Sequence, residues 1–199
     1  MKRTREHALG TRTALLEAAE CVFYERGFTG ATLDEIARRA GVTRGALYGH
    51  FENKLAILNA LFADAARPLD PFAVKLTDCE AHSFEQFIEE IRRCWRDVTN
   101  TPRAGRLYAL LLNLFTNSPD AEPLLKRFKE AVRNSEWSIE EWLRRAICDG
   151  SLPETFNSEK AARVIHATLN GLLRRRLLDL DEKPLPDAEV GAIVRALVK

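Results

Sequence analysis

The segment VTRGALYGHFENK, residues 42–54, concentrates side chains that suit binding to double-stranded DNA. An arginine can pair bidentately with guanine, and a threonine can bond to a base or touch a thymine methyl group. Tyrosine, histidine and lysine can donate to phosphate oxygens, which fixes the register of a protein on DNA without reading sequence. The residues that we expect at DNA are Thr32, Thr43, Arg44, Gly45, Ala46, Tyr48, Gly49, His50 and Lys54.

Two glycines, Gly45 and Gly49, interrupt a run that otherwise reads as helical. Each should cost such a helix about 1 kcal/mol relative to alanine. One explanation is that a DNA duplex must approach the helix backbone closely, and the other is tight packing within a helical hairpin. Helix caps, basic residues and aromatic residues converge on the same segment, and this agreement favours DNA.

The helices that must position these side chains are also visible in the sequence. One helix stops at Gly27, and the next opens with Thr32 and Glu35 in capping-box spacing. A tight turn then leads to a helix with Thr43 as its N-cap. A helix, a short turn containing glycine and a second helix form the helix-turn-helix pattern, in which the second helix faces the major groove.

Basic residues add two expectations. Lys54 lies in the first turn of a fourth helix, where a docked phosphate would offset the unfavourable interaction between a cation and the helix dipole. At the start of the chain, Lys2, Arg3, Arg5 and Arg12 form a basic arm that either reaches a minor groove or remains a disordered tail.

The stretch ATLDEIARRAGVTRGALYGHFENK closely resembles the DNA-binding signature of the TetR family of one-component transcriptional regulators, over about residues 10–60. The resemblance implies a dimer that binds a palindromic operator, usually as a repressor that a small molecule releases. Efflux-pump repressors of this family often read YWHF where this chain reads YGHF, and the missing bulky residue at Gly49 could alter base preference or loosen the helix. The positions that the family uses at DNA are Thr43, Arg44, Gly45, Tyr48, His50 and Lys54.

The remaining sequence predicts further helices near residues 83–99, 103–116, 119–149, 158–180 and 186–198. Pro68 and Pro71 separate them from the first four helices. The predicted fold is therefore all-α, with an N-terminal three-helix helix-turn-helix DNA-binding domain and a C-terminal helical ligand-binding and dimerisation domain. The expected boundaries are residues 1–52 for the DNA-binding domain with its N-terminal arm, 53–67 for a connecting helix, and 68–199 for the effector-binding and dimerisation domain.

The C-terminal region has more apolar surface than one face of a helical bundle needs. Its apolar stripes either converge on a cavity with a few polar anchors, as a small-molecule site requires, or simply fill a core. The family resemblance favours a pocket, while His166 by itself is expected to be a core or rim histidine. The candidate lining residues are Phe87, Ile91, Cys94, Tyr108, Leu111, Leu112, Ser135, Ile139, His166, Leu169, Asn170 and Leu173.

The last two predicted helices carry small and aliphatic residues that suit a seam between two subunits or, alternatively, an intramolecular core. These residues are Ala161, Ile165, Thr168, Leu172, Ile193 and Leu197. The layout of this region, DGSLPETFNSEKAARVIHATLNGLLRRRLL, is loosely similar to the multidrug-efflux-repressor branch of the family. We expect a homodimer held by these two helices.

Other classes of protein are disfavoured. The four histidines and four cysteines show no metal-ligand spacing, and no nucleophile-elbow, P-loop or dinucleotide-binding motif occurs, so we expect no metal, no cofactor and no enzyme activity. The start lacks an apolar signal core and the longest apolar run is too short to span a membrane, which predicts a cytoplasmic protein with reduced cysteines. Because the net charge is only +1, a local basic patch must meet the DNA.

The sequence therefore predicts a transcriptional regulator that binds a palindromic operator as a dimer, as a repressor released by a small apolar or amphipathic effector. Control of an efflux pump is one option for its role. The alternative is a DNA-binding protein without a small-molecule effector, whose C-terminal half only dimerises or docks a protein partner. An internal cavity would favour the first, and a filled core with a large exposed apolar patch would favour the second.

Overall fold

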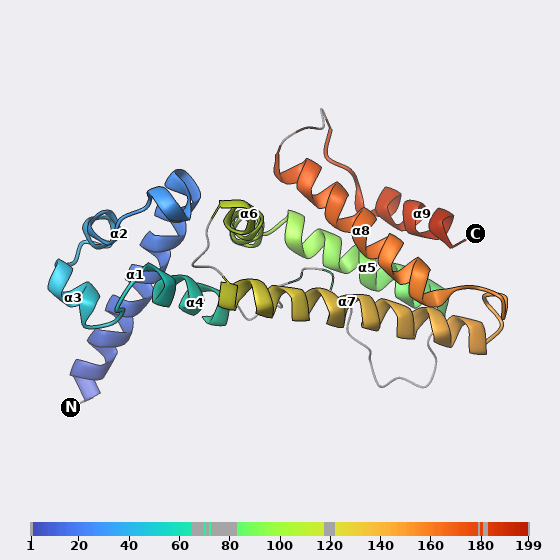
Figure 1. The fold of residues 1–199 in the computed structure, drawn as a ribbon, viewed down its shortest axis with the longest axis horizontal. Coiled ribbons are helices and arrows are strands. Elements are labelled where there is room, and N and C mark those ends of the chain that lie inside the picture. Colours follow the sequence, from blue (N-terminus) through green and yellow to red (C-terminus); the bar gives the residue numbers. More distant parts are fainter. Residues whose placement is uncertain are drawn as a thin grey trace. The chain divides into compact units, whose positions relative to one another are not determined.

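The computed structural model describes residues 2–64, 70, 72, 83–117, 122–178, 180 and 183–198, so the junction predicted at Pro68 and Pro71 lies outside it. Within these ranges every regular element is a helix, as the sequence predicts (Figure 1). No helix in the described ranges combines the length and the apolar character that crossing a membrane requires. The helices are α1 (Lys2–Gly30), α2 (Leu33–Arg39), α3 (Arg44–Tyr48), α4 (Lys54–Asp64), α5 (Phe84–Thr99), α6 (Pro102–Asn117), α7 (Glu122–Cys148), α8 (Ser158–Leu177) and α9 (Asp187–Leu197).

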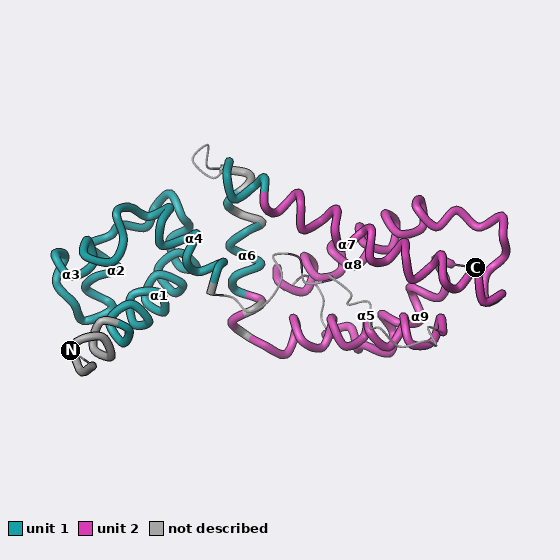
Figure 2. Tube along the Cα trace, turned by 90° about the horizontal axis from the view of Figure 1, so that it is seen from below, with its two compact units in different colours: residues 1–66, 106–126 teal, residues 67–105, 127–199 magenta. Residues whose placement is uncertain are grey.

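The chain forms two compact units (Figure 2). Unit 1 comprises residues 1–66 and 106–126, and unit 2 comprises residues 67–105 and 127–199. The chain passes between the units inside α6 and again inside α7. Most of α6 is thus grouped with the N-terminal helices, whereas the predicted division assigns it entirely to the C-terminal domain. The predicted functional boundaries remain predictions.

Capping residues build the helix-turn-helix of unit 1 as the sequence predicts. The Thr32 side chain accepts a hydrogen bond from the Glu35 N–H, and the Glu35 carboxylate accepts one from the Thr32 N–H in return. Gly41 takes a φ of 69° in the following turn, a left-handed conformation that suits glycine. Thr43 then caps α3 by accepting from the Ala46 N–H at 3.2 Å.

Helix α1 is longer than the sequence predicts at both ends. Its backbone is helical from Lys2, and the two alternatives for the basic start, a minor-groove arm or a disordered tail, remain predictions. Near the other end, Gly27 has a φ of 70°, which kinks α1 at the predicted stop before it continues to Gly30. On the inner side of α1, Phe23 is buried, as are Leu47 and Phe51 after the turn, so these side chains belong to the core of unit 1.

A buried carboxylate ties α1 to α6 within unit 1. Glu20 is only 4% exposed, and its Oε1 accepts hydrogen bonds from Nε and Nη2 of Arg106 at 3.1 and 2.8 Å. A buried carboxylate is costly unless a cation or hydrogen-bond donors pair with it. No sequence pattern points to this pair, whose members lie 86 residues apart.

We expect Arg106→Ala to lower the free energy of unfolding by about 1–3 kcal/mol, because the buried Glu20 carboxylate loses a charged donor. Arg39→Ala is the matched control in the same unit, since Arg39 and Glu25 form a pair in which both side chains are over 40% exposed. Such exposed pairs contribute about 0–1 kcal/mol. Chemical denaturation measures both losses, and equal losses would mean that the buried pair has no special role.

In unit 2, α9 packs along α5. Asp187 in the first turn of α9 accepts a hydrogen bond from Arg96 of α5 at 2.6 Å, which holds the pKa of Asp187 below its ordinary range. Near the other end of α9, Arg195 pairs with Glu85 of α5. Between these ion pairs, a Cβ added at Gly191 would lie 3.1 Å from side-chain carbons of Ile88 and Arg92 on α5, so glycine permits the close approach of the two helices there.

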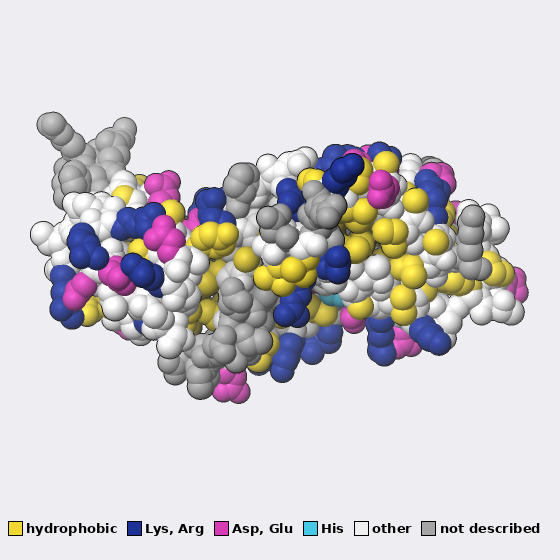
Figure 3. Space-filling view, turned by 90° about the horizontal axis from the view of Figure 1, so that it is seen from above, with side chains coloured by type: hydrophobic (Ala, Val, Ile, Leu, Met, Phe, Trp, Pro, Cys, Tyr) yellow, Lys and Arg dark blue, Asp and Glu magenta, His cyan; other side chains and the backbone are white. Residues whose placement is uncertain are grey.

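Only part of the predicted subunit seam is exposed. Ile165 is fully buried in unit 2, so its predicted place at a subunit seam is wrong. Leu197 is 37% exposed, and Val164 of α8, which the sequence analysis did not single out, is 41% exposed. Figure 3 shows hydrophobic side chains gathered on one face of unit 2. The other predicted seam residues are partly exposed, namely Ala161, Thr168, Leu172 and Ile193.

Candidate DNA-binding face and effector region

Helix α3 presents the predicted DNA-binding residues on the surface of unit 1. Arg44 is exposed, Tyr48 is 45% exposed, and the buried Leu47 between them fixes which side of α3 faces the core. Thr43 uses an oxygen lone pair in its cap, which leaves the hydroxyl proton available for an acceptor. The remaining predicted contacts on this helix and at its end are Gly45 and Gly49, both exposed, and Ala46 and His50, both half-buried.

The structure separates the two explanations for the glycines. A Cβ added at Gly45 would come no closer than 3.9 Å to the side chains around it, and at Gly49 the nearest atom is the Ala46 carbonyl oxygen at 3.4 Å. Both are ordinary van der Waals distances, and neither glycine has a positive φ. Packing within the described part of the chain therefore does not require glycine at either position. This finding contradicts the tight-packing explanation and leaves an external partner.

Arg44 is held by two neighbours although it is exposed. Its Nε lies 3.2 Å from Oδ1 of Asp34 on α2, and its Nη1 donates to Oδ2 of the same carboxylate at 3.4 Å. Its Nη2 donates to the Tyr48 hydroxyl at 3.3 Å, and the guanidinium carbon lies 5.5 Å from the centroid of the Tyr48 ring. The hydrogen bond to Tyr48, followed by the charge of Asp34, raises the pKa of Arg44 above its ordinary value.

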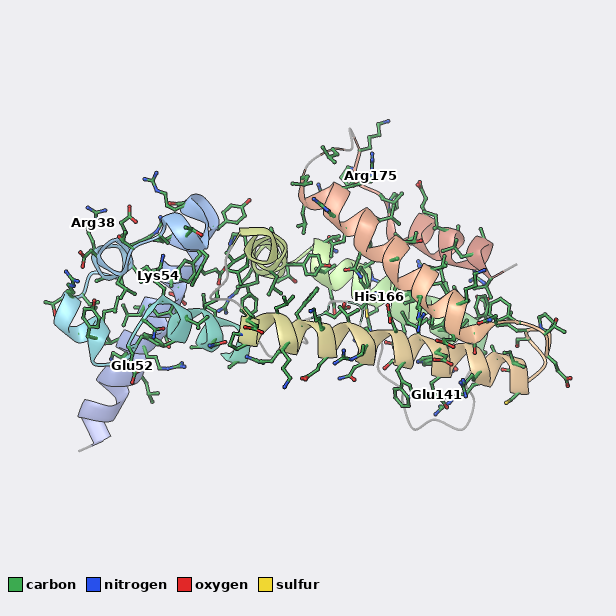
Figure 4. All side chains as sticks on the ribbon, viewed as in Figure 1. Arg38, Glu52, Lys54, Glu141, His166 and Arg175 are labelled. Carbon is green, nitrogen blue, oxygen red and sulfur yellow. The ribbon has the colours of Figure 1, made fainter. Side chains whose placement is uncertain are left out.

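Lys54, labelled in Figure 4, has internal partners that the sequence analysis did not anticipate. Its Nζ donates to the carbonyl oxygens of Phe28, Thr29 and Ala31 at 2.8, 3.2 and 2.8 Å, and lies 5.0 Å from the Phe28 ring centroid. An ammonium group has three N–H donors, so these three carbonyls match all of them. Lys54 therefore fastens the start of α4 to the end of α1. Its predicted phosphate contact remains a prediction and would compete with these bonds.

The Thr32 side chain also forms its hydrogen bonds within the chain. Besides accepting from the Glu35 N–H, its hydroxyl donates to the Glu35 carboxylate at 3.1 Å. The cap therefore uses both the oxygen and the proton of this hydroxyl, and a direct contact of Thr32 with DNA remains a prediction.

A buried polar cluster lies within unit 2 around His166 of α8 (Figure 4). Nε2 of His166 lies 2.8 Å from Oδ2 of the fully buried Asp70, and Nδ1 lies 3.8 Å from a carboxylate oxygen of Glu136 on α7. Asn170, one turn further along α8, donates to the backbone carbonyl of His166 at 3.0 Å. His166 is therefore a buried, paired histidine, as the sequence predicts, with a partner 96 residues away.

Most of the predicted pocket residues are buried. Burial raises the pKa of the Cys94 thiol to about 11, so this side chain stays neutral near pH 7. Tyr108 and Leu111 are buried on the part of α6 that belongs to unit 1, and the side chain of Leu112 is not among those described. Burial fits a filled core as well as a ligand site, so the pocket remains a prediction. The residues in unit 2 are Phe87, Ile91 and Cys94 on α5, Ser135 and Ile139 on α7, and His166, Leu169, Asn170 and Leu173 on α8.

One of these residues carries an unpaired polar atom. The Ser135 hydroxyl oxygen on α7 is fully buried and has no hydrogen-bond partner among the described residues. Buried hydroxyl groups are nearly always hydrogen-bonded, so an unsatisfied one needs an explanation. Ser135 precedes Glu136, the α7 residue that approaches His166.

Comparison with known proteins connects this geometry to gene regulation. Residues 15–61, which run from α1 through α3 into α4, match the family model for bacterial regulatory proteins of the tetR family. Over nearly its whole length the chain is similar to the HTH-type transcriptional regulator TtgR of Pseudomonas putida. The two are 32% identical over 189 residues, which cover 94% of this chain and 87% of TtgR.

Solved structures show the same similarity. NalD, the secondary repressor of the MexAB-OprM multidrug efflux pump in Pseudomonas aeruginosa, has a TM-score of 0.77 at 26% identity, with 96% of each chain covered. SmeT in complex with triclosan has a TM-score of 0.74 at 27% identity, with 95% of this chain and 92% of SmeT covered. SmeT is the repressor of the Stenotrophomonas maltophilia multidrug efflux pump SmeDEF.

Proposed function

The chain belongs to the TetR family of bacterial regulatory proteins, and we propose that it is a repressor that binds a palindromic operator as a dimer through the exposed face of α3. Its family and relatives are transcriptional regulators and not enzymes. The observation that carries the proposal is the pair of exposed glycines beside Arg44, which no packing within the described chain requires. We also propose that the protein works in the cytoplasm, where bacterial operator DNA lies.

Selection of DNA from a random pool by the full-length protein tests this proposal. We expect two inverted half-sites whose centres lie about 10–10.5 base pairs apart, or a multiple of that spacing, because two-fold symmetry places the two reading helices in successive major grooves. The selection should be run at about 0.15 M salt, where sequence-independent binding is weak. A pool that contains no enriched motif would contradict operator binding.

We further propose that a small molecule releases this repressor from DNA. We also propose that it controls a multidrug efflux pump, as NalD and SmeT do. SmeT has been solved with triclosan bound, which supports an effector and speaks against a C-terminal half that only dimerises or docks a protein. The effector is apolar with at least one polar group. It lies among the buried apolar side chains of α5, α7 and α8 in unit 2, with the Ser135 hydroxyl as its hydrogen-bond partner.

We expect Ser135→Ala to weaken effector binding without weakening the fold. Removal of an unsatisfied buried hydroxyl leaves the free energy of unfolding unchanged or raises it by up to about 1 kcal/mol. Loss of a hydrogen bond to the effector costs about 1 kcal/mol, roughly a fivefold weaker affinity. Triclosan, the molecule bound to SmeT, is the first probe, and calorimetry measures its affinity.

Ser138→Ala is the control, because the Ser138 hydroxyl is already paired with the backbone carbonyl of Asn134 at 2.9 Å. This variant should bind triclosan as the wild type does. If Ser135→Ala also binds as tightly as the wild type, the hydroxyl does not face the effector and the placement on α7 is wrong.

A further inference from the structure

We propose that Asp34 on α2 determines the sequence specificity of this protein by holding Arg44 of α3 in the one conformation that reads a base pair. The inference rests on the proposed binding of an operator by α3. Asp34 lies in the stretch that resembles the family signature, but it is not among the residues expected to contact DNA. The contacts between Arg44 and the Asp34 carboxylate are what identify Asp34 as part of the DNA-binding face.

The hydrogen bonds of Arg44 leave a suitable pair of donors. A guanidinium group has five N–H donors. Nη1 donates to Asp34 and Nη2 donates to Tyr48, so one donor of each terminal nitrogen is directed within the chain, while Nε lies 3.2 Å from the Asp34 carboxylate as part of the ion pair. Each Nη carries a second N–H, and two N–H donors are what O6 and N7 of guanine require in the major groove. Asp34 and Tyr48 therefore select which edge of Arg44 remains for the base.

Stability does not explain the pair between Asp34 and Arg44. The two side chains are 62% and 63% exposed, and exposed ion pairs contribute little to folding. What the pair does provide is order in a long side chain that would otherwise sample many rotamers. A side chain that is ordered before binding loses less conformational freedom when the DNA arrives.

The charge of Asp34 adds discrimination. A carboxylate next to the reading helix repels the phosphates of any DNA, whatever its sequence. At the operator, the hydrogen bonds between Arg44 and its base compensate for this repulsion. At other sequences Arg44 has no matching base, so the repulsion is not compensated. Specificity is a difference between two affinities, so a group that disfavours the wrong sites raises it as effectively as one that favours the right site.

The test compares wild type and Asp34→Asn on the selected operator and on random-sequence DNA at the same salt. We expect the affinity for random DNA to rise about threefold, because a repelling charge is lost. The ratio of operator to random affinity should fall about tenfold, because Arg44 is no longer held. Glu35→Gln is the matched control. It removes the same charge from the same turn of α2, and glutamine can keep the capping contacts with Thr32. Its ratio should stay within about twofold of wild type.

A second pair of variants separates positioning from direct reading. In an Arg44→Ala background, Asp34→Asn should change the ratio by less than about twofold, because the side chain that Asp34 positions is absent. If the ratio still falls about tenfold in that background, Asp34 reads a base itself and the positioning role is wrong. An unchanged ratio for Asp34→Asn in the wild-type background also overturns the proposal. Wild-type protein that selects no operator refutes the proposed function instead, before any variant is made.

Discussion

Gly45→Ala is expected to stabilise the protein and at the same time to weaken its binding to the operator. Alanine in place of an exposed helical glycine raises the free energy of unfolding by about 0.5–1 kcal/mol. The added Cβ meets no close neighbour within the described chain, so nothing offsets this gain. On DNA, the same methyl group occupies the space through which the duplex approaches α3. We expect a loss of about tenfold in operator affinity, or about 1.4 kcal/mol.

Thermal unfolding and operator titration of the same preparation measure the two effects. Gly10→Ala is the control, because Gly10 is also an exposed helical glycine whose added Cβ would have nothing within 4 Å. It should gain similar stability and bind the operator as the wild type does. Wild-type affinity in Gly45→Ala would mean that DNA does not come close to this part of α3.

Disruption of the subunit interface is expected to have the largest effect on operator binding. Val164 and Ala167 are exposed and lie three residues apart on one side of α8. We choose them for this test because Ile165, which the sequence analysis placed at the seam, is buried within unit 2. Glutamates at both positions should give a monomer, because two copies would bring four like charges into an apolar contact. A monomer engages one half-site, so the affinity should fall by at least about 100-fold, or about 2.7 kcal/mol.

Sedimentation and operator titration measure these outcomes. Trp137→Glu on α7 is the control, since Trp137 is 58% exposed and also apolar but lies on another helix. This variant should remain a dimer. A dimer that survives Val164→Glu with Ala167→Glu would rule out this face of α8 as the interface.

Features that depend on neighbours within one turn could be predicted from the sequence. The capping box of Thr32 and Glu35 and the cap of Thr43 act over three residues, so residue types and spacing determine them. The limits of the later helices agree with their apolar periodicity to within a few residues. The buried positions of Leu47 and Phe51 follow from the same periodicity.

Features that depend on distant partners could not be predicted. Lys54 binds carbonyl groups 23 to 26 residues earlier in the chain, and a backbone carbonyl has no sequence signal. Glu20 and Arg106 are 86 residues apart, and each by itself is typical of a solvated helix face. Asp34 is only 10 residues from Arg44, but its position in the first turn of α2 already has a local explanation in the helix dipole. Periodicity alone also left open whether the C-terminal stripes surround a pocket or a filled core.

The most direct test of the account is amide hydrogen exchange of the full-length wild-type protein with and without the selected operator. The central claim is that the exposed face of α3 lies against DNA. We therefore expect the amides of residues 43–50 to exchange more slowly when the operator is bound, while those of α9 keep their rates. Unchanged exchange at residues 43–50 in a protein saturated with operator would contradict the claim.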